Sequence, residues 1–179
     1  MASPLPLLDP HPARRARDHD RLDQREGALM FHVTETIDIA GPPDAVFAFL
    51  TDPARRPQWD RTVMSEQLLT PPPVAPGSRI RTRMSVMGRE VEFEWRVTAF
   101  DAPREMAAES DSGTLPARMR FDFTATDTGC RVRSSLEAEP TGLLRFVEPI
   151  VEGTARSTLA EGLARAKRLI EEERSAGRA

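Results

Sequence analysis

The chain has 179 residues, a formal net charge of −3, and 39% hydrophobic and 30% charged residues. These values fit one globular domain with extra segments, and the acidic balance argues against a nucleic-acid binder. The longest apolar run is far shorter than the roughly 20 residues of a membrane-spanning helix, and no signal peptide is evident. Cys130 is the only cysteine, so no internal disulfide can form. We therefore expect a cytoplasmic protein without a membrane span.

Residues 1–29 differ in composition from the rest of the chain. They are rich in Pro, Arg and Asp, contain five arginines and five acidic residues, and show no hydrophobic periodicity. Low hydrophobicity with many charges is typical of disorder, so we expect a disordered tail, with a docking arm as the alternative. Regular patterning begins at Met30, which could be the native start. We assign residues 30–175 to a single folded domain.

Alternation of apolar and polar residues predicts a strand-rich domain. From Phe31 to Ile39 every second residue is apolar except Glu35, a period of two that is typical of a half-buried strand. The Gly-Pro-Pro-Asp segment at 41–44 ends this strand. The residues up to Trp59 then predict two short helices, because proline is favoured in the first turn of a helix. The clearest later strand runs over residues 91–99, where apolar and polar, mostly charged, residues alternate.

About six strands follow the short helices, and the short turns between them predict an antiparallel meander. From Gly142 to about Arg174 the pattern is helical, and roughly 30 residues would span about 45 Å. Pro149 and Gly153 separate two apolar stripes of this helix, so we expect a bend or break between them. We predict an α+β fold in which a sheet of about seven antiparallel strands wraps around the long C-terminal helix and leaves a cavity between them.

The chain resembles the SRPBCC superfamily over residues 30–174. The segments that carry this resemblance are Ile37–Phe47, Asp52–Trp59, Met87–Arg89, Arg96–Arg104, Thr128–Val132 and Ala164–Glu171. The resemblance implies the helix-grip fold of START-like proteins and polyketide cyclase/dehydrases, here as a ligand-binding domain over residues 30–175. Because the superfamily includes lipid carriers, aromatase/cyclases and ribosome-associated factors, the fold does not settle the activity.

The sequence offers few candidates for catalysis. Glu35 shares the inward face of its strand with apolar residues, so it is a weak candidate for an acid in the cavity. The simpler interpretation is that the strand frays near Glu35 and leaves this side chain at the solvent-exposed edge of the cavity. His32 falls on the outward face of the same strand, and Cys130 has no obvious base beside it. We expect neither a metal site nor a cofactor, because the three histidines and one cysteine are scattered.

The leading hypothesis is a binder of a small hydrophobic molecule, lipid-like or polyketide-like, in a cavity of at least roughly 300 Å³. A polyketide cyclase or dehydratase is the first alternative, and a protein- or ribosome-interaction module is the second. The sequence leaves open the ligand, any catalysis and whether a homodimer forms. The candidate ligand-binding residues are Glu35, Trp59, Thr82, Met84, Phe93, Trp95, Met119, Phe121, Val147, Val151 and Thr154, with Ser134 and Thr158 as further polar contacts.

Overall fold

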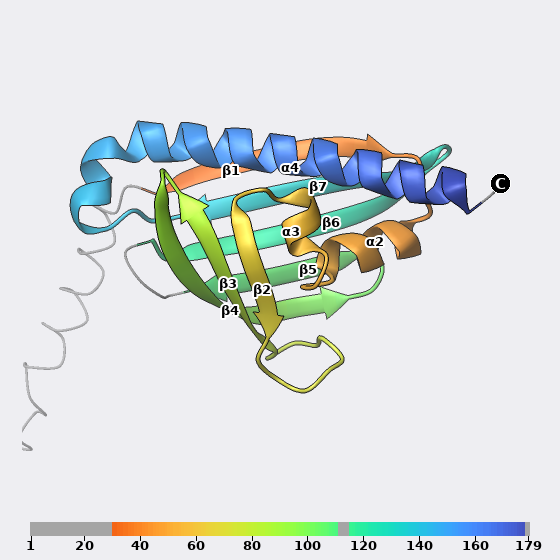
Figure 1. Cartoon of the computed structure of the whole chain (residues 1–179), viewed down its shortest axis with the longest axis horizontal. Helices are drawn as coiled ribbons and strands as arrows, with labels where there is room; N and C mark the ends of the chain where they lie inside the picture. Colours follow the sequence, from red (N-terminus) through yellow and green to blue (C-terminus); the bar gives the residue numbers. More distant parts are fainter. Residues whose placement is uncertain (1–29, 111–114, 178–179) are drawn as a thin grey trace, which may run out of the picture.

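The computed structural model describes residues 30–110 and 115–177, and the predicted disordered tail, residues 1–29, lies outside the described residues. Figure 1 shows a curved sheet, one long helix that runs along it, and two short helices beside it. The elements in chain order are β1 (Phe31–Ile39), α2 (Pro43–Thr51), α3 (Arg56–Trp59), β2 (Val63–Leu68), β3 (Arg79–Val86), β4 (Arg89–Asp101), β5 (Glu105–Ser110), β6 (Ala117–Thr126), β7 (Gly129–Ala138), the 3-10 helix η1 (Gly142–Val147) and α4 (Glu148–Ala176).

The strands form one antiparallel sheet in the order β1-β7-β6-β5-β4-β3-β2. Strands β2 to β7 form a meander, whereas β1 pairs with β7, so the first and last strands are neighbours. The register between them is unbroken from Phe31 opposite Ala138 to Ile39 opposite Cys130. The structure thus confirms the predicted α+β architecture, with two short helices after the first strand and a long C-terminal helix.

The two faces of the sheet differ in chemistry. The face toward α4 carries buried aromatic side chains, including Phe93, Trp95 and Phe121. The opposite face carries cross-strand pairs of Arg and Glu between β3 and β4 and between β4 and β5. Register shifts interrupt β2 and β4, and such bulges bend a strand and increase its twist. These bulges therefore contribute to the curvature that encloses the space under α4.

The C-terminal half of α4 makes the closest contact with the rest of the fold. The buried side chains of its second apolar stripe are Leu163, Ala166 and Ile170. Trp59 on α3 packs against Gly162, where an added Cβ would lie 3.3 Å from the indole ring. Trp59 also meets Phe121 of β6 edge to face, with 6.3 Å between the ring centroids. The indole therefore acts as a spacer between α4 and the sheet.

The break expected between Pro149 and Gly153 lies earlier in the chain. The 3-10 helix η1 ends at Val147, and α4 runs without interruption from Glu148 to Ala176. Pro149 stands in the first turn of α4, where a missing backbone N–H costs nothing. Gly153 continues the helix with its Cα exposed. The sequence pattern therefore predicted one helix where the structure has two, η1 and α4. It also placed the break a few residues closer to the C-terminus than the junction at Val147–Glu148.

The contact between Trp59 and α4 can be tested with two glycines of the same helix. Replacing Gly153 by Ala should raise the free energy of unfolding by about 0.5–1 kcal/mol, because the new Cβ meets nothing within 4 Å and alanine is the better helix former. The same change at Gly162 should give a smaller gain or a loss, because the Cβ presses on Trp59. Urea unfolding of both variants checks this, and equal stabilisation would contradict the tight contact.

Candidate functional site

A cavity of about 220 Å³ lies between the sheet and the N-terminal half of α4. Its walls are mostly apolar, with side chains from β1, β3, β4, β6, β7 and α4. Met87, in the turn between β3 and β4, lines the cavity and is half exposed, which places an opening at this turn. The hydroxyl groups in the lining include those of Ser134, Thr154 and Thr158. The cavity is therefore a largely apolar space with a few polar groups, which is the usual composition of a small-molecule site.

The cavity is smaller than the sequence-based expectation of at least roughly 300 Å³. Large side chains occupy much of the space under α4, among them Trp95 and Leu159. Three of the lining residues are methionines, Met84, Met87 and Met119. Methionine is unbranched and has three rotatable bonds, so these side chains can change the shape of the cavity at low cost. The structure thus has room for a compact ligand, and a larger one requires the methionines to move.

Eight of the residues predicted from the sequence line this cavity together: Met84, Phe93, Trp95, Met119, Ser134, Val151, Thr154 and Thr158. Three others, Trp59, Thr82 and Phe121, are buried outside the cavity lining. Val147, at the end of η1, is half-buried against the core, also outside the lining. The alternation along the strands was therefore enough to find the cavity face, but it could not separate residues that line the space from residues that lie behind it.

Glu35, the weak catalytic candidate, lies outside the cavity lining. Strand β1 does not end near this residue, because its pairing with β7 continues on both sides. The Glu35 carboxylate faces α4, where Arg156 Nη1 lies 3.7 Å from its Oε1 atom and both side chains are partly exposed. The geometry therefore assigns Glu35 a surface ion pair between β1 and α4.

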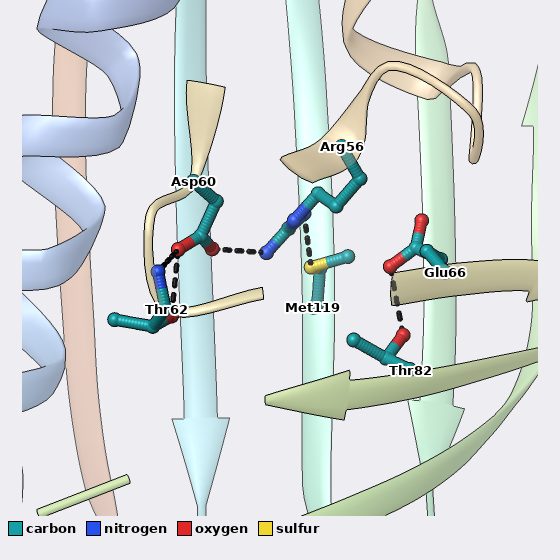
Figure 2. A network of polar contacts seen from close by, with 6 residues as sticks. All are labelled: Arg56, Asp60, Thr62, Glu66, Thr82 and Met119. Atoms are coloured by element: carbon teal, nitrogen blue, oxygen red, sulfur yellow. Dashed lines mark hydrogen bonds and ion pairs between the residues drawn. The ribbon is translucent and has the colours of Figure 1, made fainter. Parts of the chain in front are cut away.

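An ion pair that the sequence analysis missed stands in the cavity wall. Figure 2 shows Arg56, from α3, between Asp60 on one side and Met119 on the other. Arg56 Nη2 donates to Asp60 Oδ2 at 2.9 Å, and the two side chains are only 13% and 5% exposed. Both residues line the cavity. Their spacing of four residues is a recognisable signal for an ion pair, but its burial depends on where α3 packs.

Asp60 is held in place by further contacts. Its Oδ1 atom accepts hydrogen bonds from the backbone N–H of Thr62 at 3.1 Å and from the Thr62 hydroxyl at 2.6 Å. The Arg56 guanidinium also stacks over Trp59, 4.2 Å from the ring centroid. These contacts hold both ends of the pair in place in the cavity wall.

A second carboxyl, Glu66 of β2, lies close to this pair (Figure 2). Its Oε2 atom accepts a hydrogen bond from the Thr82 hydroxyl of β3 at 2.7 Å. Burial raises the pKa of Glu66 above its ordinary value of 4.5, although the nearby Arg56 guanidinium and the Thr82 hydroxyl act in the opposite direction. Its charged form is therefore less stable in the folded protein than in water.

The other candidates from the sequence lie away from this cavity. Cys130 of β7 is buried, and burial raises the pKa of its thiol, which makes it a poor nucleophile. His32 is exposed on β1 and contacts Thr34 and Glu137. Within residues 30–110 and 115–177, no group of three His, Cys, Asp or Glu side chains is placed to hold a metal ion. In the same ranges, no helix has the length and hydrophobicity needed to cross a membrane.

A family model described as polyketide cyclase/dehydrase and lipid transport matches residues 30–171, which is most of the chain. The chain belongs to this polyketide cyclase/dehydrase and lipid transport family. The match covers all elements from β1 to η1 and most of α4, and it includes the whole cavity lining. No curated protein sequence matches the chain significantly.

Solved structures share the fold of this family member at low sequence identity. A Thermus thermophilus protein has 17% identity and a TM-score of 0.70, over 80% of this chain and 99% of its own. A START superfamily protein from Mycobacterium smegmatis has 18% identity and a TM-score of 0.65, over 79% and 97%. The di-domain ARO/CYC protein BexL has 18% identity and a TM-score of 0.64, over 87% of this chain but 59% of BexL. These likenesses support the predicted SRPBCC-type helix-grip fold.

The state of Glu66 predicts how the stability of this family member depends on pH. A raised pKa means that the folded state binds the proton more tightly than the unfolded state, so stability falls as pH rises through the interval just above 4.5. Glu66→Gln keeps an acceptor for Thr82 but cannot ionise. The variant should melt at a higher temperature than the parent at neutral pH, and the difference should vanish below about pH 4.

Thermal unfolding followed by circular dichroism at several pH values measures this difference. Glu172→Gln, an exposed position on α4, serves as the matched control and should melt like the parent at every pH. A Glu66→Gln variant that is less stable than the parent at neutral pH would show that the Glu66 charge is favourable in the fold.

Proposed function

We propose that this protein binds a small hydrophobic molecule in the cavity under α4. The observation that carries the proposal is the cavity itself, a mostly apolar space with a few hydroxyl groups and one buried ion pair. A space of this composition favours an apolar molecule that leaves water and makes one or two polar contacts. Membership of a family that includes lipid transport proteins and polyketide cyclases supports the same class of ligand.

The volume of the cavity limits the ligand. At about 220 Å³ it fits a single ring system or a medium-length chain without rearrangement. Movement of Met84, Met87 and Met119 would extend the space toward the opening at the turn between β3 and β4. We therefore propose a compact lipid-like or polyketide-like ligand.

The two alternatives from the sequence have less support. A cyclase or dehydratase would need an acid or base beside the substrate. Glu35 lies outside the cavity lining. Asp60, the acid in the lining, is already bound to Arg56 and Thr62. An interaction module would need a contiguous exposed apolar surface. Among the described residues, the large exposed apolar side chains lie on separate elements, apart from Phe146 and Ile150 where η1 meets α4. Binding is the function that the geometry supports best.

A cavity-filling substitution tests the proposal. Ala155 lies on α4 and lines the cavity, so Ala155→Phe should fill part of the space. The variant should bind aminoanthracene, a small uncharged fluorescent dye, at least about tenfold more weakly than the parent. Ala160→Phe, the same change at an exposed position of the same helix, is the matched control and should bind the dye like the parent.

Dye fluorescence titrations give the affinities, and circular dichroism confirms that both variants are folded. Mass spectrometry of the natively purified parent should also detect a copurifying lipophilic molecule. Absence of dye binding to the parent, or equal binding by the parent and Ala155→Phe, would refute the cavity as the binding site.

A further inference from the structure

The charges in the cavity wall are few and already paired. Among the described residues that line the cavity, Arg56 is the only cation and Asp60 is the only acid. They bind each other at 2.9 Å and are almost fully buried. Removing two charges from water costs several kcal/mol for each ion, and only a well-made pair offsets this cost. Any further charge in this cavity therefore needs its own partner.

Arg56 retains donor capacity that the protein does not use well. A guanidinium carries five N–H donors. Nη2 donates to Asp60, whereas Nη1 points to the thioether sulfur of Met119 at 3.8 Å, which is a weak acceptor. Nε has no hydrogen-bond partner among the described residues. Because Met119 also lines the cavity and is flexible, a ligand oxygen can replace its sulfur at Nη1.

Negative charge is in excess around this one cation. Asp60 pairs directly with Arg56, and Glu66 lies near enough for its carboxyl to interact electrostatically with both (Figure 2). A ligand carboxylate that approached Nη1 would meet a cation already neutralised by Asp60 and would bury an uncompensated charge beside two acidic groups. A ketone or ester oxygen would accept the same hydrogen bond without adding charge.

We propose that the cavity selects uncharged ligands that carry a carbonyl oxygen, that Arg56 donates to this oxygen, and that Asp60 determines the exclusion of carboxylates. This inference rests on the proposed function, because it specifies the chemistry of a ligand in the same cavity. Asp60 acts here as a specificity-determining residue: it cancels the positive charge that would otherwise attract an acid. The apolar body of the ligand then lies against the aromatic and methionine walls.

Two competitors of equal carbon count test this selection. Methyl hexyl ketone and octanoate are each titrated, at neutral pH, against the parent protein with bound aminoanthracene. The ketone should displace the dye, and octanoate should bind at least about tenfold more weakly than the ketone. This comparison uses the unmodified chain, so it does not depend on the folding of any variant. Equal affinity for the two competitors, or preference for octanoate, would overturn the proposal.

Asp60→Asn tests which residue sets the preference. The asparagine oxygen can still accept the two hydrogen bonds from Thr62, while the wall gains a net positive charge. Octanoate should then bind at least about tenfold more tightly than it binds the parent, with the dye affinity of the variant measured first. Asp101→Asn, which removes the acid of an exposed ion pair with Arg104, is the matched control and should leave all affinities unchanged. Unchanged exclusion of octanoate in a folded Asp60→Asn would refute the role of Asp60.

The double variant Arg56→Met with Asp60→Asn tests the role of the guanidinium. It removes both charges together, so no unpaired ion stays in the cavity wall. The ketone should bind several-fold more weakly than to the parent, while the dye still binds and octanoate is still excluded. Unchanged ketone affinity would show that Arg56 does not contact the ligand oxygen.

If the dye does not bind the parent at all, the proposed function itself fails, which is a different outcome from loss of selectivity.

Discussion

Unequal contact along the two halves of α4 is the constraint on which the rest of this structure depends. In the C-terminal half, Leu163, Ala166 and Ile170 are buried, and Trp59 presses on Gly162. In the N-terminal half, only Val151 is buried, and the neighbouring side chains line a cavity. A helix is stiff over this length, so a spacer at its middle and tight packing of one half hold the other half away from the sheet. The cavity therefore exists because the packing elsewhere along α4 is tight.

The polar chemistry of the site follows from the same packing. The short helix α3 is placed by Trp59, and this placement brings Arg56 and Asp60 into the cavity wall. An ion pair in an apolar wall is costly, and a hydrophobic replacement of the pair would often be as stable. Its presence is consistent with the ligand selectivity that we propose. A neutral pair with a spare donor favours a neutral acceptor over an ion.

The family supplies a fold, but proteins of one fold differ in chemistry. Solved structures below 20% identity share this helix-grip arrangement, and one of them is an ARO/CYC protein. What distinguishes members must lie in side chains that reach the space between sheet and helix. In this chain, the side chains that reach this space include the three methionines, which let the cavity change shape, and the Arg56–Asp60 pair, whose two charges cancel.

The sequence by itself determined the order of strands and helices, the antiparallel meander and the inward face of most strands, because a period of two or 3.6 residues is a local property that survives in any tertiary context. It also located eight cavity-lining residues through the periodicity of the strands and of the C-terminal helix. The tertiary structure alone decided the rest. Glu35 was placed on the correct face, but Arg156, far along the chain, decides that it forms a surface ion pair. The volume of the cavity depends on the distance between α4 and the sheet, which Trp59 and Gly162 set. Such distances arise from contacts between residues remote in sequence, and no local pattern encodes them.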